Sequence, residues 1–493
     1  MNVLTRIVKL VLGLFLALVV LAVGLLYLAP GIHISSLKMV MNVMTGAGAD
    51  TPDDTLLSQL EVAEGYHLSV YARGIANPRM LATDAEGRLL VSSPRSGEVI
   101  QLIDSNGDGA ADTQRALLSG LRRPHGIALN GGFLYVAESH QVLRVGYDMA
   151  SGEVGPSPEL VVTGLTDDGN HWTKSITFDE EGMLYVAMGS TCNVCEEPDP
   201  RRATIMRYKA DGSSGEIYAS GLRNSVGLAF TPWSGELYAT DNGRDLLGDD
   251  YPPCELNRIE QDGFYGWPYL NGDNDPDPDF GEMRKDLQSR AIIPAFNFPA
   301  HNAPLGIYFP KDRQRTALVA LHGSWNRSTP DGYRVLRLRW QDSGEIQSED
   351  FLWGFLRDEE VIGRPVDIAG DGEEGFFISD DYARVIYRVS PYSRKSAVSS
   401  VVDSPAASSP AVDSLKVDAA LAAAGSEVYR QYACGECHDD SAATPLPLTG
   451  LSDKYDLQSL ADYFLTPTPP MPNFGLDEQQ RRQLAHYLMG EEM

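Results

Sequence analysis

The sequence predicts an all-β six-bladed β-propeller, preceded by an N-terminal transmembrane helix and followed by a small all-α domain. Three observations support this: a two-strand unit recurs along the middle of the chain, an apolar run precedes it, and a helical pattern follows it. With 493 residues, 43% hydrophobic and 22% charged, the chain is globular but too long for one core. We expect a membrane anchor or signal at 1–30, a juxtamembrane segment at 31–55, the propeller at 56–392, a flexible linker at 393–418 and the helical domain at 419–493.

The N-terminal apolar run predicts the anchor. Residues 10–29 carry no charge, and Arg6 and Lys9 stand before them. Such a run spans about 30 Å as a helix, the thickness of a bilayer core, whereas a cleaved signal has an apolar region of only about 7–15 residues. We therefore expect an uncleaved anchor with its basic residues in the cytoplasm. The rest of the chain then lies on the periplasmic side of the inner membrane, or is secreted to the periplasm if the segment is cleaved.

The repeated unit predicts the propeller. Each copy has a short apolar strand, a turn and a second strand with alternating apolar residues. The first strands begin at residues 87, 133, 183, 236, 317 and 376, and the wide interval after the fourth holds an insertion. Short strands at this repeat length, with Gly and Asp turns, are typical of propeller blades. Ligands of such a ring bind at one face near the central axis, so functional residues are expected on loops at the blade tops.

The net charge limits the partners. At −28, with a pI near 4.6, the chain is strongly acidic. This excludes a nucleic-acid partner, because phosphate binding requires a basic surface. The charge suits a soluble surface outside the cytoplasm, but it does not identify a substrate.

The C-terminal segment carries the pattern C-x-x-C-H. Its residues Cys434, Cys437 and His438 predict covalent attachment of haem c, with His438 as one iron ligand. Met471, between prolines, is the expected second ligand, and His486 is the alternative. A His and Met ligand pair raises the haem potential for electron transfer. The helical domain is therefore expected to be a cytochrome c domain.

Two further patterns concern metals and cysteines. Residues 104–112 follow the D-x-N-x-D-G pattern of a calcium loop but lack the glutamate at its twelfth place, which leaves a structural Ca²⁺ site or a plain polar turn. The expected ligands are Asp104, Asn106, Asp108 and Asp112. Outside the cytoplasm, Cys192 and Cys195 are expected to form a disulfide, which leaves Cys254 as an odd thiol.

Polar motifs recur where blade tops are expected. They are Asn170-His171-Trp172-Thr173-Lys174, Gly221-Leu222-Arg223-Asn224, Asp241-Asn242-Gly243-Arg244-Asp245, His322-Gly323-Ser324-Trp325-Asn326-Arg327 and Gly363-Arg364-Pro365-Val366-Asp367. At these residues the chain resembles the soluble pyrroloquinoline quinone (PQQ) sugar dehydrogenases, and more closely their sorbosone dehydrogenase-like branch. The resemblance covers about residues 60–389, and the C-terminal appendage is similar to that of quinohaemoprotein members. It implies PQQ in the central funnel, a bound Ca²⁺ and oxidation of an aldose or related polyol.

The resemblance also implies residue roles. His171 stands at the general base position, with His125 as the rival, because oxidation of a hydroxyl-bearing carbon requires removal of the O–H proton. The expected cofactor contacts, matched to the carboxylates and dione of PQQ, are Arg223, Asn224, Arg364 and, more loosely, Arg327. The expected calcium loop near PQQ comprises Gly243, Arg244, Asp249 and Asp250. Ser190 and Thr191 stand where members closer to the glucose enzymes have amide and acidic side chains.

The expected function is sugar oxidation by hydride transfer to PQQ, with electrons passing to haem c and on to a respiratory acceptor. A linker of this length has an r.m.s. reach of about 25–30 Å, which keeps the haem near the funnel. One alternative is a calcium-dependent lactonase-type hydrolase. The other is a non-enzymatic, membrane-tethered electron-transfer or binding protein, which would gain no activity from PQQ and Ca²⁺.

Overall fold

The computed structural model describes residues 53–311, 314–357 and 360–392, and in the C-terminal part 419–432, 434–438, 448, 451, 455, 457–464, 467, 471, 474 and 476–491. The chain divides into two compact units, 1–397 and 398–493. The expected membrane segment at 1–30 and the linker at 393–418 lie outside the described residues and stay predictions. No helix in the described part is both long and apolar enough to span a bilayer.

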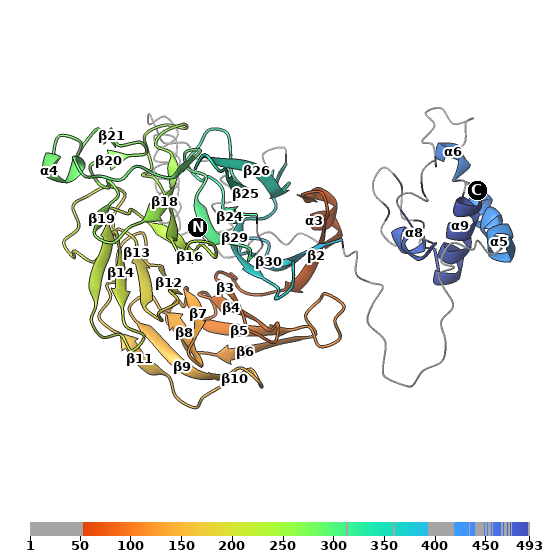
Figure 1. The fold of residues 1–493 in the computed structure, drawn as a ribbon, viewed down its shortest axis with the longest axis horizontal. Helices are drawn as coiled ribbons and strands as arrows, with labels where there is room; N and C mark the ends of the chain where they lie inside the picture. Colours follow the sequence, from red (N-terminus) through yellow and green to blue (C-terminus); the bar gives the residue numbers. More distant parts are fainter. Residues whose placement is uncertain are drawn as a thin grey trace, which may run out of the picture. The chain divides into compact units, whose positions relative to one another are not determined.

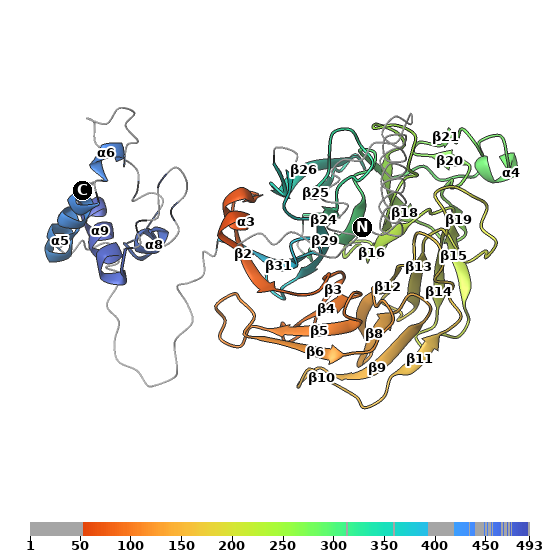
Figure 2. The same ribbon diagram turned by 180° about the vertical axis from the view of Figure 1, so that it is seen from behind.

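Six sheets of four or five strands, antiparallel except where β19 joins the third, form the first unit, which confirms the six-bladed propeller (Figures 1 and 2). After helix α3 (Asp53–Gln59), blade 1 has β3 (Leu81–Thr83), β4 (Leu89–Ser93), β5 (Glu98–Ile103) and β6 (Thr113–Leu118). Blade 2 has β7 (Ile127–Asn130), β8 (Phe133–Ala137), β9 (Val142–Asp148), β10 (Glu153–Val154) and β11 (Glu159–Val162). Blade 3 has β12 (Lys174–Phe178), β13 (Leu184–Met188), β14 (Thr204–Tyr208), β15 (Glu216–Ser220) and β19 (Gly263–Phe264).

The remaining blades close the ring. Blade 4 has β16 (Ser225–Phe230), β17 (Leu237–Asp241), β18 (Cys254–Ile259) and β22 (Phe296–Phe298). Blade 5 has β23 (Pro304–Tyr308), β24 (Thr316–Leu321), β25 (Arg334–Trp340), β26 (Ile346–Trp353) and β1 (Glu61–Val62). Blade 6 has β29 (Pro365–Gly370), β30 (Phe376–Asp380), β31 (Val385–Pro391) and β2 (Tyr66–Arg73). The N-terminal strands β1 and β2 thus complete the last two blades and join the two ends of the ring.

The burial pattern explains why these segments form blades. The second strands β4, β13, β17, β24 and β30 are buried at every residue, because each blade is covered on both faces by its neighbours. The innermost strands contact one another in the order β3, β7, β12, β16, β23, β29 and back to β3. The strands predicted from sequence are the second and third strands of each blade.

The wide interval after the fourth repeat holds a short subdomain. It contains β20 (Leu270–Asn271), β21 (Asp275–Pro276) and α4 (Lys285–Gln288), and its strand β19 pairs in parallel with β15 of blade 3. A second small hairpin, β27 (Leu356–Arg357) with β28 (Glu360–Val361), lies between blades 5 and 6 in sequence. The insertion therefore leaves the blade count unchanged.

The second unit is helical where it is described. It contains α5 (Ala419–Gln431), α6 (Gly435–His438), α8 (Leu457–Tyr463) and α9 (Glu478–Glu491). Helices α5 and α9 pack closely at Gly425, where an added Cβ would lie 2.0 Å from the carbonyl oxygen of Gln483. Val428, Leu460, Phe464 and Leu484 belong to its core. This small all-α core agrees with the expected helical domain.

Candidate active site

Two sets of loops lie at one end of the six sheets. One set precedes the innermost strands, and the other joins the second strand of each blade to the third. Because neighbouring strands within a blade are antiparallel, both sets lie at the same end of the propeller. This end carries the predicted residues His171, Arg223, Asn224, Gly243, Arg244, Asp249, Asp250, Arg327 and Arg364.

His171 precedes β12 and has a defined tautomer. Its Nδ1 lies 2.9 Å from the carbonyl oxygen and 2.9 Å from the hydroxyl oxygen of Ser190. The carbonyl can only accept, and the Ser190 hydroxyl donates its own hydrogen to the carbonyl of Cys192 at 2.7 Å. Nδ1 therefore carries the proton, and Nε2 keeps its lone pair. Within the described part of the chain, Nε2 makes no hydrogen bond.

The surroundings of His171 keep it neutral. Burial lowers the pKa of His171 to about 3, and the nearby positive charge of Arg223 acts in the same direction. The imidazole is therefore uncharged at pH 7, and Nε2 can accept a proton.

Gly189 brings His171 and Asn224 side by side. An added Cβ at Gly189 would lie 2.7 Å from Cβ of His171 and 2.6 Å from Oδ1 of Asn224. Oδ1 of Asn224 is buried and has no hydrogen-bond partner among the described residues. A buried acceptor without a donor is costly, and such atoms in a site commonly meet a ligand.

Arg223 joins two loops beside His171. The five N–H groups of its guanidinium donate to Asn193 O at 2.9 Å, Asn242 O at 3.1 Å, Gly243 O at 2.8 Å, Asn193 Oδ1 at 2.9 Å and Asp245 Oδ2 at 3.1 Å. All of its donors are thus used within the chain. Its positive charge stays beside His171, while its hydrogen bonds set the shape of the site.

Buried carboxyl groups hold the backbone of two of these loops; the sequence places Asp241 in a polar motif without indicating this role, and no motif indicates Asp380. Asp241, at the end of β17, accepts from the N–H of Arg223 at 2.8 Å and from that of Asn224 at 2.6 Å. Asp380, at the end of β30, accepts from the N–H of Arg364 at 2.9 Å. Burial raises the pKa of each carboxyl to about 7. Arg223 and Arg364 are therefore placed by the same device in blades 4 and 6.

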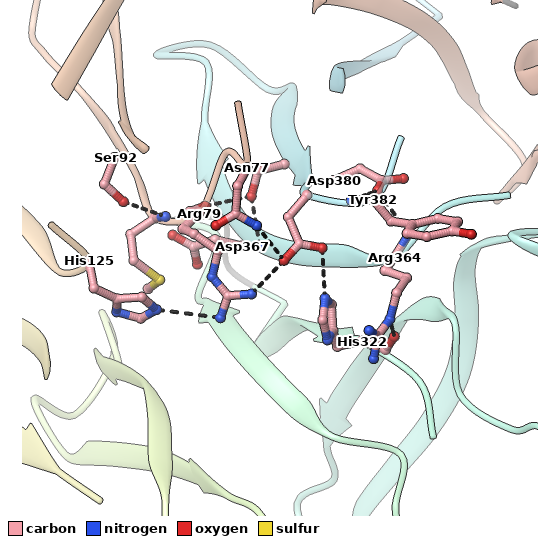
Figure 3. Close-up of polar contacts among 12 residues, drawn as sticks. Asn77, Arg79, Ser92, His125, His322, Arg364, Asp367, Asp380 and Tyr382 are labelled. Carbon is pink, nitrogen blue, oxygen red and sulfur yellow. Dashed lines mark hydrogen bonds and ion pairs between the residues drawn. The ribbon is translucent and has the colours of Figure 1, made fainter. Parts of the chain in front are cut away.

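A second polar cluster spans blades 1, 2, 5 and 6 (Figure 3). The carboxylate of Asp381 accepts from Arg79 Nη1 at 2.8 Å, from Asn77 Nδ2 at 3.1 Å and from His322 Nε2 at 2.9 Å. Burial, with the charge of Arg364 second, lowers the pKa of His322 to about 4. His322 is therefore neutral at pH 7, although the Asp381 carboxylate acts in the opposite direction on its pKa.

Arg364 and His125 complete this cluster. Nε of Arg364 donates to the carbonyl of His322 and Nη2 to that of Gly323, each at 3.0 Å, whereas its Nη1 makes no hydrogen bond to the described residues. His125 is buried, with Nε2 at 3.5 Å from Nη2 of Arg79 and Nδ1 without a described partner. Burial lowers the pKa of His125 well below its usual range. His125 thus belongs to the Arg79 cluster, but it lies on the blade next to that of His171, with its ring 6.0 Å from the ring of Trp172.

A comparison of the repeats would have found Arg79. It stands two residues before β3, His125 stands two before β7, and Arg223 stands two before β16. The sequence places His322 in a polar motif without indicating a role for it. No motif singles out Asn77, Arg79 or Asp381. Their pairing crosses about the whole propeller sequence, so spacing alone carried no signal for it.

The other expected calcium and cofactor residues have partners of their own. Arg244 pairs with Asp277 at 2.6 Å and with Asp279 at 3.0 Å in the insertion. Arg327 pairs with Asp250 at 3.1 Å, and the Asp250 side chain is 91% exposed. The backbone N–H of Ser328 donates to Asp249. These side chains connect loops, while Gly243 lies next to Arg223 through its carbonyl.

The expected structural calcium loop lies between β5 and β6, at the opposite end of blade 1. Asp104 accepts from the N–H groups of Gly107 and Gly109 at 2.7 and 2.8 Å, and Asp112 accepts from Ser105 at 2.7 and 2.8 Å. Asn106 Nδ2 donates to Asp108 at 3.1 Å. Within the described part of the chain, this loop does not bring three His, Cys, Asp or Glu side chains together as a metal site would. The loop remains a prediction.

The cysteines of the propeller agree with expectation. Cys192 and Cys195 form a disulfide, and Cys254 is a buried thiol. In the helical unit, Cys434 immediately precedes α6 and is buried, and its carbonyl accepts from the N–H of His438, the last residue of that helix, at 3.1 Å. Met471 is partly buried against the helical core, and the side chain of Cys437 lies outside the described residues.

The TrAA12-like family model matches residues 60–258 and 282–391, which is the propeller without most of its insertion. The chain belongs to the TrAA12-like family. The match covers both sides of the candidate site, including the loops of His171, Arg223 and Arg364.

Relatives of this TrAA12-like chain include named enzymes. A protein of Borreliella burgdorferi without a characterised function is 31% identical over 68% of this chain and 92% of its own length. The pyrroloquinoline quinone-dependent pyranose dehydrogenase of Coprinopsis cinerea is 25% identical over 58% of this chain and 46% of its own length. The corresponding sugar dehydrogenase of Hypocrea jecorina is 27% identical over 53% of this chain and 73% of its own length. The chain thus spans less than half of the Coprinopsis enzyme.

Solved structures confirm the fold of this TrAA12-like chain. A calcium structure of a Trichoderma reesei family AA12 carbohydrate-active enzyme has a TM-score of 0.60 at 23% identity, covering 68% of this chain and 97% of that one. The holo PQQ domain of the Coprinopsis cinerea pyranose dehydrogenase has a TM-score of 0.58 at 21% identity, covering 67% and 97%.

The contact at Gly189 gives a first prediction. In this TrAA12-like chain, Gly189→Ala is expected to push His171 and Asn224 apart and to lower kcat/KM for sugar by about 10²-fold, the usual effect of a 1 Å misplacement. Gly146→Ala is the matched control, because an added Cβ there meets nothing within 4 Å. Steady-state kinetics with a dye acceptor and thermal unfolding measure both variants. Equal activity of the two variants would show that this contact does not position His171 for activity.

Proposed function

We propose that this chain is a PQQ-dependent dehydrogenase that oxidises the hydroxyl-bearing carbon of an aldose or related sugar, with His171 as general base. The observation that carries the proposal is the Nε2 lone pair of a neutral His171 beside the unsatisfied Oδ1 of Asn224. The family and the names of the relatives support the same chemistry. No observation favours a hydrolase.

The residues present fit an anionic quinone. PQQ carries three carboxylates, and guanidinium groups bind carboxylates through paired N–H donors. Nη1 of Arg364 and Nε of Arg79 make no hydrogen bond to the described residues, so each retains donors for such a ligand. Oδ1 of Asn224 supplies an acceptor on the His171 side. We propose Arg364, Arg79 and Asn224 as the residues that hold the cofactor.

Arg223 and Arg327 are expected from the sequence to contact the cofactor, and their hydrogen bonds favour other roles. Since all five donors of Arg223 are bound by the chain, we propose that it acts on the reaction through its charge and through the loops it holds. Arg327 connects the loop of Asp250 to its own loop, and we propose a structural role there. We also propose that Ca²⁺ binds at Gly243, with its backbone carbonyl oxygen as a ligand, because Ca²⁺ prefers oxygen ligands.

The mechanism follows from the state of His171. When bound, the quinone supplies the acceptor for the hydride that leaves the sugar carbon. Nε2 of His171 takes the proton of the hydroxyl on that carbon, so a C=O bond forms as the C–H bond breaks. The Ser190 carbonyl keeps its hydrogen bond with Nδ1–H and orients the ring throughout. The charge of Arg223 disfavours a lasting imidazolium, which promotes release of the proton afterwards.

The helical unit is proposed to receive the electrons. Cys434 and Cys437 would attach haem c, with His438 and Met471 as iron ligands, and His486 on α9 remains the alternative sixth ligand. Sugar oxidation yields two electrons and haem accepts one at a time, so two transfers per turnover are needed. We propose that the electrons pass on to a respiratory acceptor and that residues 1–30 hold the protein on the periplasmic side of the inner membrane.

Reconstitution tests the proposal. Full-length protein is mixed with PQQ and Ca²⁺, the bound quinone is followed by its absorbance, and dye reduction is measured with a panel of aldoses and polyols. We expect saturable PQQ binding and sugar-dependent dye reduction that needs both additions. Binding of PQQ without oxidation of any sugar in the panel would overturn the proposed activity.

A further inference from the structure

Arg202 is a buried cation that makes no direct ion pair with the described residues. It precedes β14 and is 2% exposed. Its Nε is also buried and has no hydrogen-bond partner among the described residues. Burying a guanidinium is costly, and the charges of the nearby Glu197 and Asp168 carboxylates offset part of that cost without a direct hydrogen bond to it.

Backbone carbonyls accept the hydrogen bonds of Arg202, and they belong to the His171 site. Arg202 donates to Thr166 O at 3.1 Å, Asp168 O at 3.0 Å, His171 O at 3.3 Å and Ser190 O at 3.2 Å. The first three carbonyls lie on the segment that carries His171 to β12. A single guanidinium therefore holds this segment to the loop that follows β13.

The Ser190 carbonyl is the shared atom of this arrangement. It accepts from Nδ1 of His171 at 2.9 Å and from Nη2 of Arg202 at 3.2 Å. An oxygen held by a fixed cation cannot turn away from the imidazole. As long as it stays in place, a proton on Nδ1 of His171 is hydrogen-bonded, whereas a lone pair on Nδ1 would face a carbonyl oxygen and be repelled.

The disulfide loop fixes the same carbonyl from the other side. The Ser190 N–H donates to the carbonyl of Arg223 at 2.7 Å, and the Ser190 hydroxyl donates to the carbonyl of Cys192 at 2.7 Å. Cys192 is bonded to Cys195, and Asn193 between them accepts from Arg223. Ser190 is therefore held at its N–H, its hydroxyl and its carbonyl.

We propose that Arg202 is a positioning residue that holds the Ser190 carbonyl against Nδ1 of His171, so that Nε2 faces the substrate as an unprotonated base. Arg202 does not touch the reacting atoms and acts through His171. The inference depends on the proposed function for its catalytic consequence, but the tautomer it specifies exists in the protein without substrate or cofactor.

The test reads the tautomer directly. The full-length protein is labelled with ring-¹⁵N histidine, and two-bond ¹H–¹⁵N correlation spectra at pH 7 distinguish Nδ1–H from Nε2–H rings, with His171→Gln used to assign the signal. We expect His171 to carry its proton on Nδ1. In Arg202→Met we expect a mixture of tautomers, a kcat for sugar lowered by about 10- to 100-fold and a KM within about twofold of the original. Lysine can still reach some of the carbonyls, so the tautomer ratio and kcat of Arg202→Lys are expected to lie between those of the wild type and of Arg202→Met.

Arg207→Met is the matched control, since Arg207 lies on β14 and pairs with Glu216 instead of the His171 segment. It should leave the His171 signal and kcat unchanged. A wild-type His171 with its proton on Nε2, or an Arg202→Met protein with unchanged tautomer and kcat, overturns the inference. Should Arg202→Met not fold, the wild-type tautomer and Arg202→Lys still decide it. Correct tautomers in a protein that binds PQQ but oxidises no sugar would overturn the proposed function and leave the positioning of His171 intact.

Discussion

Replacement of His171 by glutamine is expected to lower the rate of sugar-dependent PQQ reduction by about 10²–10⁴-fold, the range that a general base contributes. Glutamine retains hydrogen-bonding groups for the Ser190 carbonyl but cannot take up the hydroxyl proton. The side chains that we propose to hold PQQ are untouched, so the cofactor should still bind. Rapid mixing of reconstituted protein with excess sugar, followed at the quinone absorbance, measures the rate.

His67→Gln is the control for this prediction, because His67 is exposed on the outer strand β2 of blade 6. It should react like the unmodified protein. The rival base is tested by His125→Gln. His125 contacts Arg79 and lies in the other polar cluster, so we expect this variant to weaken PQQ binding more than the rate of reduction. A His171→Gln protein with an unchanged rate, together with an inactive His125→Gln protein that binds PQQ, would assign the base to His125.

Replacement of both Cys434 and Cys437 by alanine is expected to abolish covalent haem completely. The two thiols are the proposed points of attachment, and without them haem is lost on denaturation. Haem staining of denaturing gels and the reduced spectrum measure this loss. Sugar oxidation with a dye acceptor should persist, because the propeller is a separate compact unit.

Cys254→Ala is the matched cysteine control. Cys254 is buried in blade 4, far along the sequence from the C-x-x-C-H pattern, and its loss should leave the haem content unchanged. A double variant at 434 and 437 that still stained for haem would contradict the assignment of a cytochrome c domain. A variant without haem that also lost dye-linked sugar oxidation would show that the two units are not independent.

The propeller could be predicted because each blade repeats a local signal. The second strands, such as β13 and β24, are apolar at nearly every position because they are covered on both faces, and this pattern is visible without any partner. The way in which the ring closes could not be predicted from such a local pattern. The outer strands β1 and β2 come from the N-terminal side of the repeats and pair with β26 and β31, nearly the whole propeller away in sequence.

The candidate site was predictable in position but not in contacts. The loops of His171, Arg223 and Arg364 could be placed at one end from strand order alone. The hydrogen-bond acceptors of each arginine could not be predicted, because many of them lie on other blades or in the insertion. Arg244 pairs with Asp277, and Arg79 pairs with Asp381 at a sequence separation of 302 residues.

The most direct test of the account is anaerobic mixing of full-length haemoprotein, loaded with PQQ and Ca²⁺, with an aldose while the haem spectrum is followed. The account predicts that the haem becomes reduced, that the rate does not depend on protein concentration because the electrons pass within one chain, and that His171→Gln slows the reaction by about 10²–10⁴-fold. A haem that stays oxidised with every aldose and polyol while PQQ is bound would contradict it.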